Sequence, residues 1–164
     1  MKALSLRQPW LWAVLELGKT IENRRWNTKY RGPILLHAAK GCTVVECGDA
    51  VRQIRTMTGI DWQYDSRWRG YDNLDRGGIC GYAEIVDVVP PTTKQWPLII
   101  KATTAELRWH MPEQYGFVLR NVRRLPFTPC RGLQRWFEIP DAHEMFDVPD
   151  VTPEGERLKS EETM

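Results

Sequence analysis

The residues best suited to chemistry lie close together in the stretch GKTIENRR, residues 18–25. If this stretch is extended, Glu22 and Arg24 share one face, because successive side chains of a strand point to opposite sides. Lys19 comes at the turn just before them. The two cations suit a phosphate or a base carbonyl, and the carboxylate suits an exocyclic amine or general-base work. The plainer alternative is an ion pair that only sets strand geometry.

The residues that follow interleave cations with aromatic rings: Arg25, Trp26, Lys29, Tyr30 and Arg31. Such a composition is typical of a surface that binds single-stranded nucleic acid, where stacking is worth about 1–3 kcal/mol per base. A solvated loop whose rings anchor it to the core has the same composition. The residues leave both interpretations open.

Three further residues are candidates for a ligand site beside this stretch. His37 lies in an apolar run, where a histidine is either structural or a residue that shuttles a proton. Gln8 and Trp10 stand at an expected helix start and face the same site, although the ring of Trp10 also suits the core. No spacing of His, Cys and acidic residues matches a metal geometry, so we expect neither a metal nor a cofactor.

Length and composition favour one globular domain. The chain has 164 residues, of which 42% are hydrophobic and 27% are charged. No apolar run approaches the roughly 18 residues of a membrane span, and the first residues lack the pattern of a signal peptide. The four cysteines form no CxxC pair, which favours reduced thiols. We therefore expect a cytoplasmic protein that does not enter a membrane.

The charge is unevenly distributed along the chain. Residues 141–164 contain eight acidic and two basic side chains, which leaves 21 basic and 13 acidic ones, a net charge of +8, in residues 1–140. A basic body favours a polyanionic partner. Arg120, Arg123 and Arg124 on a late strand either extend the basic surface or are merely solvated. Eight tryptophans supply both core and candidate stacking rings.

The pattern of apolar residues predicts several short strands and few helices. Helices are expected at residues 9–17 and 43–57, with a short one near 104–109, and strands at 2–6, 20–25, 33–38, 79–89, 115–125 and 136–139. Residues 61–78 have few aliphatic side chains and suit a surface excursion. Strands and helices do not alternate regularly, which argues against a doubly wound sheet. We predict an α+β fold, a small mixed β-barrel flanked by helices.

Five blocks of the sequence, in this order, together resemble the ASCH (activating signal cointegrator homology) domains: LSLRQPW at 4–10, GKTIENRRW at 18–26, YRGPILLHAA at 30–39, GICGYAEIVDV at 78–88 and YGFVLRNVRRL at 115–125. The similarity covers residues 3–139. The family pattern GxKxxExR places Lys19, Glu22 and Arg24 on its charged positions. Leu17 stands where the pattern has its first glycine, and Gly18 follows one residue later.

The resemblance implies a PUA-like barrel with a cleft that binds RNA or a nucleotide- or nucleoside-like ligand. On this basis residues 1–140 are expected to form the domain, including the excursion at 61–78. Residues 141–164 are expected to form an acidic, flexible tail. The main hypothesis is a module that binds single-stranded RNA or such a ligand in a basic cleft beside the barrel.

Two alternatives follow from the same residues. The first is a hydrolase acting on RNA or on a modified nucleoside, with Lys19 and Glu22 as its catalytic groups. In the branch of the family that cleaves acetylated cytidine, a threonine occupies the position of Glu22, which disfavours that activity here. The second alternative is a protein-interaction module that uses the tail, residues 141–164, or the excursion at 61–78 to bind a partner.

Overall fold

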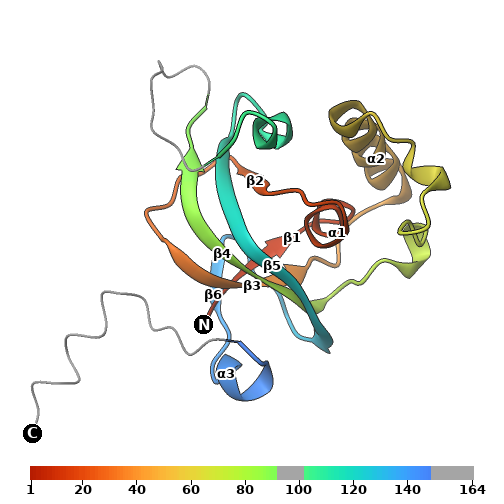
Figure 1. Ribbon diagram of the computed structural model, residues 1–164. Helices are drawn as coiled ribbons and strands as arrows, with labels where there is room; N and C mark the ends of the chain where they lie inside the picture. The colour runs from red at the N-terminus through yellow and green to blue at the C-terminus, as the bar shows by residue number, and fades with distance from the viewer. Residues whose placement is uncertain (92–101, 149–164) are drawn as a thin grey trace, which may run out of the picture.

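A computed structural model describes residues 1–91 and 102–148 of the chain. Its centre is one curled, six-stranded sheet with the order β2-β5-β4-β3-β1-β6 (Figure 1). The strands are β1 (Lys2–Leu6), β2 (Ile21–Arg24), β3 (Gly32–Ala38), β4 (Gly78–Val89), β5 (Tyr115–Pro129) and β6 (Trp136–Glu138). Among the described residues, no helix is long and apolar enough to cross a membrane.

The sheet is mixed because β1 and β3 run parallel while every other neighbouring pair is antiparallel. Between β1 and β3 the chain passes through a helix and through β2, which joins the far edge of the sheet. Irregular registers in the β3–β4 and β4–β5 pairs accompany the strong curl, as bulges increase local twist. The sheet forms a half-barrel, and the prediction of a small mixed α+β barrel is confirmed.

Helix α1 (Trp10–Glu16) packs its apolar residues into the concave side of the sheet. Leu11 and Val14 are buried against strand residues such as Leu36 and Phe117. Gly18 follows the helix with a φ of 67°, a left-handed conformation that costs glycine little. This residue turns the chain from α1 into β2, so that Lys19 enters the interior.

Helix α2 (Val44–Thr58) begins with a capping box and ends at a left-handed glycine. The hydroxyl of Thr43 accepts from the backbone N–H of Glu46, whose carboxylate accepts from the N–H of Thr43. Gly59 has a φ of 72° and donates to the carbonyl of Arg55. These local signals explain why the sequence located this helix closely.

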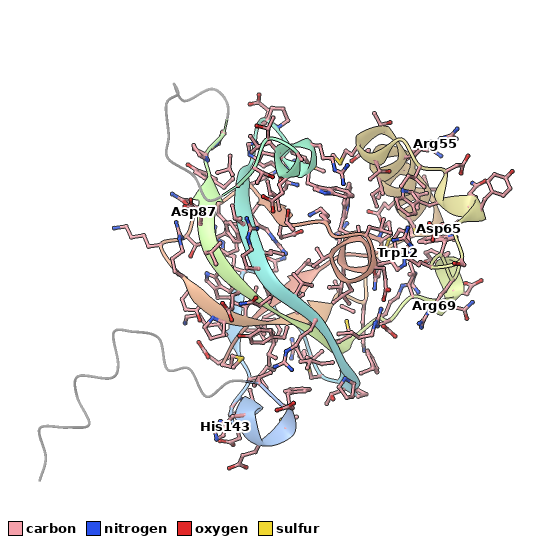
Figure 2. The ribbon with its side chains drawn as sticks, viewed as in Figure 1. Trp12, Arg55, Asp65, Arg69, Asp87 and His143 are labelled. Carbon is pink, nitrogen blue, oxygen red and sulfur yellow. The ribbon has the colours of Figure 1, made fainter. Side chains whose placement is uncertain are left out.

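The excursion at 61–78 is anchored by aromatic side chains. It contains two short 3₁₀ helices, η1 (Trp62–Tyr64) and η2 (Tyr71–Asn73). The rings of Trp62 and Trp68 pack edge-on against Trp12 of α1, with centroids 5.5 and 4.8 Å apart. Figure 2 shows Trp12 at α1, on the side that faces the excursion with Asp65 and Arg69.

Strand β5 runs four residues further than the sequence predicted. Beyond Val118 it has no pairing with β2, so that one of its edges is open and tolerates Pro126 and Pro129. Two short helices complete the structure, η3 (Glu106–Trp109) and α3 (Ala142–Met145). Phe146, just after α3, is buried in a third apolar cluster. The predicted tail from residue 149 onward lies outside the described residues.

Candidate functional site

The three charged residues of the GxKxxExR-like motif are in direct contact. Glu22 lies between the two cations, with one oxygen 3.1 Å from Lys19 Nζ and the other 3.1 Å from Arg24 Nε. Lys19 Nζ also donates to the carbonyl of Ile21 and lies 5.6 Å from the centroid of the Trp10 ring. Glu22 and Arg24 share one face of β2, as the alternation of a strand predicts.

The motif is graded in exposure from Lys19 to Arg24. The side chain of Lys19 is 1% exposed, that of Glu22 is 9% exposed and that of Arg24 is 19% exposed. Burial lowers the pKa of Lys19 below its ordinary value, and the Glu22 carboxylate offsets part of this effect. Lys19 and Glu22 thus form an interior ion pair, and Arg24 is the motif residue whose charged group is most exposed to solvent.

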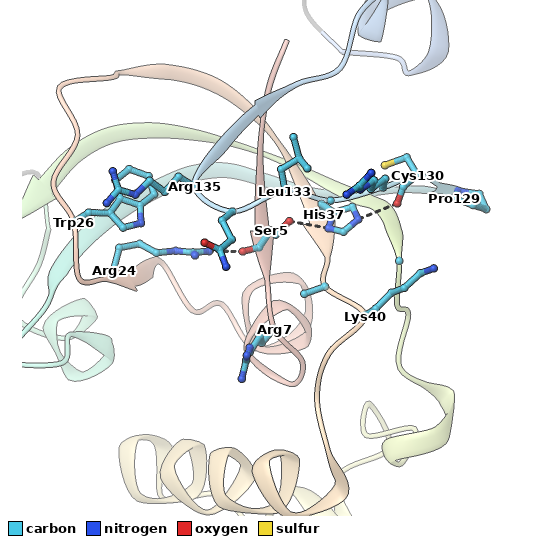
Figure 3. A pocket seen from close by; sticks show the side chains of 15 residues that line it. Ser5, Arg7, Arg24, Trp26, His37, Lys40, Pro129, Cys130, Leu133 and Arg135 are labelled. Atoms are coloured by element: carbon cyan, nitrogen blue, oxygen red, sulfur yellow. Dashed lines mark hydrogen bonds between the residues drawn. The ribbon is translucent and has the colours of Figure 1, made fainter.

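Arg24 extends from this pair into a cleft of about 1010 Å³ at one end of the sheet (Figure 3). Its Nη2 donates to the carbonyl of Ser5 at 2.5 Å, which holds the guanidinium beside β1. Its Nε is not aligned for a hydrogen bond with Glu22, although the ion-pair distance is short. The cleft is lined from the ends of four strands and by the β5–β6 loop: Ser5, Arg7, Arg24, Trp26, His37, Ala39, Lys40, Gly77 and residues 129–135.

The lining of this cleft is strongly cationic. Five of its side chains are basic, namely Arg7, Arg24, Lys40, Arg131 and Arg135, and none is acidic. Arg7 is paired with Glu46 of α2 at 3.1 Å. The pair is exposed to solvent and therefore weak, so Arg7 can still interact with an anionic ligand. Lys40, Arg131 and Arg135 form no ion pair with any residue that the structure describes. The cleft therefore suits an anionic ligand.

His37 lies at the base of the cleft and is held by two hydrogen bonds. Its Nδ1 is 3.0 Å from Ser5 Oγ and its Nε2 is 3.2 Å from the carbonyl of Cys130. The residue is 2% exposed, and burial lowers the pKa of its imidazole below the ordinary value. Gly132 packs so closely that a Cβ added there would lie 2.2 Å from His37 Cε1. Glycine is required at this position for the loop to approach the ring.

The predicted loop residues are divided between two hollows. Trp26 lines the cationic cleft, where the guanidinium of Arg135 lies 5.9 Å from its ring centroid. Lys29 and Arg31 line a separate hollow of about 400 Å³. Arg25 is exposed and lines neither hollow. Tyr30 is committed to packing, since its hydroxyl donates to the carbonyl of Pro33 at 2.7 Å and its ring meets Trp136.

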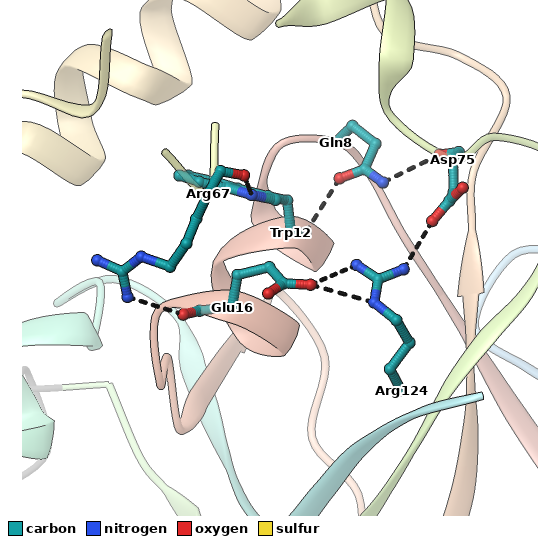
Figure 4. Close-up of polar contacts among 6 residues, drawn as sticks. All are labelled: Gln8, Trp12, Glu16, Arg67, Asp75 and Arg124. Atoms are coloured by element: carbon teal, nitrogen blue, oxygen red, sulfur yellow. Dashed lines mark hydrogen bonds and ion pairs between the residues drawn. The ribbon is translucent and has the colours of Figure 1, made fainter. Parts of the chain in front are cut away.

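Gln8 and Trp10 do not line the cationic cleft. The amide of Gln8 is used on both sides: it donates to the carbonyl of Asp75 at 2.9 Å and accepts from the N–H of Trp12 (Figure 4). Gln8 thereby satisfies a backbone donor of α1. Trp10 is half-buried over Lys19, as described above.

The late-strand arginines are used within the fold. Arg124 bonds Glu16 of α1 at 2.6 Å and Asp75 at 2.9 Å, which ties β5 to the helix and the excursion (Figure 4). Arg120 pairs with Glu106 at 2.9 Å. Arg123 lies 4.9 Å from the ring centroid of Tyr82. Because these arginines contact other parts of the fold, they do not form a second basic surface comparable to the cleft. The cleft has more basic lining residues than the hollow around Lys29 and Arg31.

Sequence reasoning did not single out several lining residues, among them Ser5, Arg7, Lys40, Arg131 and Arg135. The segment RGLQR, residues 131–135, carried a usable signal, because two arginines flank a glycine between two expected strands. Ser5, Arg7 and Lys40 carried none, since only the parallel pairing of β1 with β3 brings their segments together. Within residues 1–91 and 102–148, no group of three or more His, Cys, Asp or Glu side chains could hold a metal ion.

Comparison with known proteins agrees with the fold and with the motif. The family model described as the ASCH domain matches residues 4–126, which is most of the chain. The matched region includes the Lys19, Glu22 and Arg24 motif and ends within β5, before the loop that carries Arg131 and Arg135. No curated protein matches the chain.

Proposed function

The chain belongs to the ASCH domain family, and from that premise we propose that it binds single-stranded RNA in the cationic cleft. The family is a PUA-like family of RNA-binding domains. The observation that carries the proposal is the lining of the cleft, which contains five basic side chains and no acidic one. Phosphates bound there would release counterions, which is the main source of affinity for nucleic acid backbones.

The ring of Trp26 gives the cleft a second kind of contact. It is half-buried against Phe117 and Trp136, with centroids 5.1 and 5.5 Å away, so its orientation is fixed before a ligand arrives. A base stacked on such a ring contributes about 1–3 kcal/mol without sequence preference. Backbone contacts from the arginines and stacking on Trp26 together suit a single strand better than a duplex, whose bases are already stacked.

Lys19 and Glu22 support this binding from the interior. Both are buried, neither lines the cleft, and their ammonium and carboxylate groups are bonded to each other. This arrangement favours a role in placing Arg24 over direct contact with a ligand.

The test is the salt dependence of binding to a short fluorescently labelled RNA strand, with a DNA strand of the same sequence in parallel. In a variant with both Arg131→Ala and Arg135→Ala, the negative slope of log K against log salt should become shallower by about 1.4. Each phosphate contact on a single strand contributes about 0.7 to the size of this slope. Two matched controls should leave the slope unchanged: Arg25→Ala in the loop and Arg55→Ala on α2 (Figure 2). A slope that is equally altered in the controls would contradict binding in the cleft.

A further inference from the structure

Ser5 and His37 form a polar pair inside the cationic cleft that RNA binding does not require. They are directly paired in the parallel register of β1 and β3. Their side chains meet on the face of the sheet opposite to Leu4, Leu6 and Leu36, and both line the cleft (Figure 3). The distance from Ser5 Oγ to His37 Nδ1 is 3.0 Å, which is within the range of a nucleophile and its general base.

The hydrogen bonds fix where the protons lie. The carbonyl of Cys130 can only accept, so His37 Nε2 carries the hydrogen that bridges the 3.2 Å between them. In the neutral ring Nδ1 is then an acceptor, and it takes its hydrogen bond from the Ser5 hydroxyl. Burial lowers the pKa of His37, which keeps the ring neutral near pH 7. The order of groups is nucleophile, base and orienting acceptor, with a backbone carbonyl in place of the usual carboxylate.

The surroundings of the pair suit a reaction at an anionic group. Arg24 Nη2 is bonded to the carbonyl of Ser5 itself, so that a guanidinium is held next to the hydroxyl-bearing residue. The other four basic side chains line the same cleft. A Cβ at Gly132 would lie 2.7 Å from Ser5 Oγ, so the loop packs closely beside the hydroxyl and only glycine fits there without crowding it. Fixed cations of this kind stabilise the charge that develops on a phosphoryl group during transfer.

We propose that Ser5 is a nucleophile and His37 its general base, and that the pair transfers a phosphoryl group from phosphate esters bound in the cleft. Ser5 Oγ forms a bond to phosphorus while the bond from phosphorus to the ester oxygen breaks. The hydroxyl proton passes to His37 Nδ1 and from there to the departing oxygen. Water, deprotonated by His37, then attacks the phosphorus of the phosphoserine. The bond from phosphorus to Ser5 Oγ breaks, and the proton that His37 took from water passes to Oγ, which restores the hydroxyl and releases the phosphate.

A purely structural pair would show the same distances, because His37 is also bonded to the carbonyl of Cys130 and so holds the β5–β6 loop in place. The experiment must therefore report nucleophilicity. The full chain is incubated with an alkyl fluorophosphonate, which loses fluoride when a serine oxygen bonds its phosphorus, and the adduct is located by mass spectrometry. His37→Gln is the key variant, since its amide can keep both hydrogen bonds but cannot take up the proton. Ser5→Ala, prepared identically, controls for reaction elsewhere and for contaminating enzymes.

The proposal requires an adduct on Ser5 of the natural chain, and its formation should be at least about 100-fold slower in His37→Gln. Release of p-nitrophenol from p-nitrophenyl phosphate or from bis(p-nitrophenyl) phosphate should be lost in Ser5→Ala, and the two esters distinguish a monoester from a diester substrate. The absence of an adduct on Ser5, an equal rate in His37→Gln, or equal ester cleavage in Ser5→Ala would overturn the proposal. If His37→Gln does not fold, labelling of the natural chain still tests whether Ser5 is a nucleophile.

This inference rests on the proposed function only in treating the cleft as an anion site. Labelling and ester cleavage need no RNA, so a failure of RNA binding leaves the pair testable. Conversely, salt-dependent RNA binding by a chain whose Ser5 does not react would overturn the nucleophile alone.

Discussion

Replacement of Glu22 by glutamine tests whether the motif is an interior ion pair that supports the cleft. The substitution keeps the shape of the side chain and removes the charge that lies 3.1 Å from Lys19 and 3.1 Å from Arg24. Lys19 is 1% exposed and is left as an ammonium bonded to the carbonyl of Ile21 and to an uncharged amide. Removal of one partner of a buried pair costs about 3–5 kcal/mol.

The lower end of this range is expected, because Arg24 is partly exposed and Lys19 can lose its proton. The pKa of Lys19 is already lowered by burial and falls further without the carboxylate. Between this lowered pKa and the ordinary lysine pKa, Lys19 is protonated in the unfolded chain but not in the folded variant. The free energy of unfolding of the variant therefore rises with pH in this window. The destabilisation should therefore be smaller at about pH 9 than at about pH 7.

Urea unfolding followed by tryptophan fluorescence measures this effect. With a slope of about 1–3 kcal/mol per molar, a loss of about 3 kcal/mol moves the midpoint by on the order of 1–3 M. Lys19→Met combined with Glu22→Gln removes both charges of the pair and should recover most of the loss. The reasoning fails if Glu22→Gln costs less than about 1 kcal/mol, or if the double variant is no more stable than Glu22→Gln alone.

Three further predictions concern the base of the cleft and the thiols. Gly132→Ala should destabilise the protein by about 1–3 kcal/mol in urea unfolding, because its Cβ meets the buried His37 ring, whereas Gly48→Ala on α2 should be neutral or stabilising by up to about 1 kcal/mol. The pKa of His37 is lowered in the folded state, so the unfolded chain binds the extra proton as pH falls below about 6.5. The free energy of unfolding should therefore decrease below this pH. Urea titrations across this window should show a weaker decrease in His37→Gln. Burial raises the pKa of Cys47 to about 11 and that of Cys80 to about 12, so iodoacetamide should alkylate them far more slowly in the native state than in urea at about pH 8; equal rates would refute this burial.

Most helices and strands could be predicted from the sequence, because the features that set them involve residues only a few positions apart. The contact between Glu22 and Arg24 followed from strand alternation, and the ends of α2 followed from Thr43, Glu46 and Gly59. The length of β5 did not, since it depends on which edge of the strand is left open by β2.

The cleft was only partly predictable for a related reason. Arg24, Trp26 and His37 were identified from the motif and its neighbours, and all three line the cleft. Lys40 and Arg131 lie far from one another in the sequence and are exposed, so no periodic pattern marks them. Only the sheet order and the close packing of the β5–β6 loop bring such residues to one hollow.

Photo-crosslinking of RNA that contains 4-thiouridine, followed by mass spectrometric mapping of the attached residues, tests the central claim most directly. If single-stranded RNA binds in the cationic cleft, crosslinks should map to Trp26 and to residues 131–135, and they should weaken with added salt. Crosslinks confined to the second hollow around Lys29 and Arg31, or to the exposed face of α2, would contradict the account.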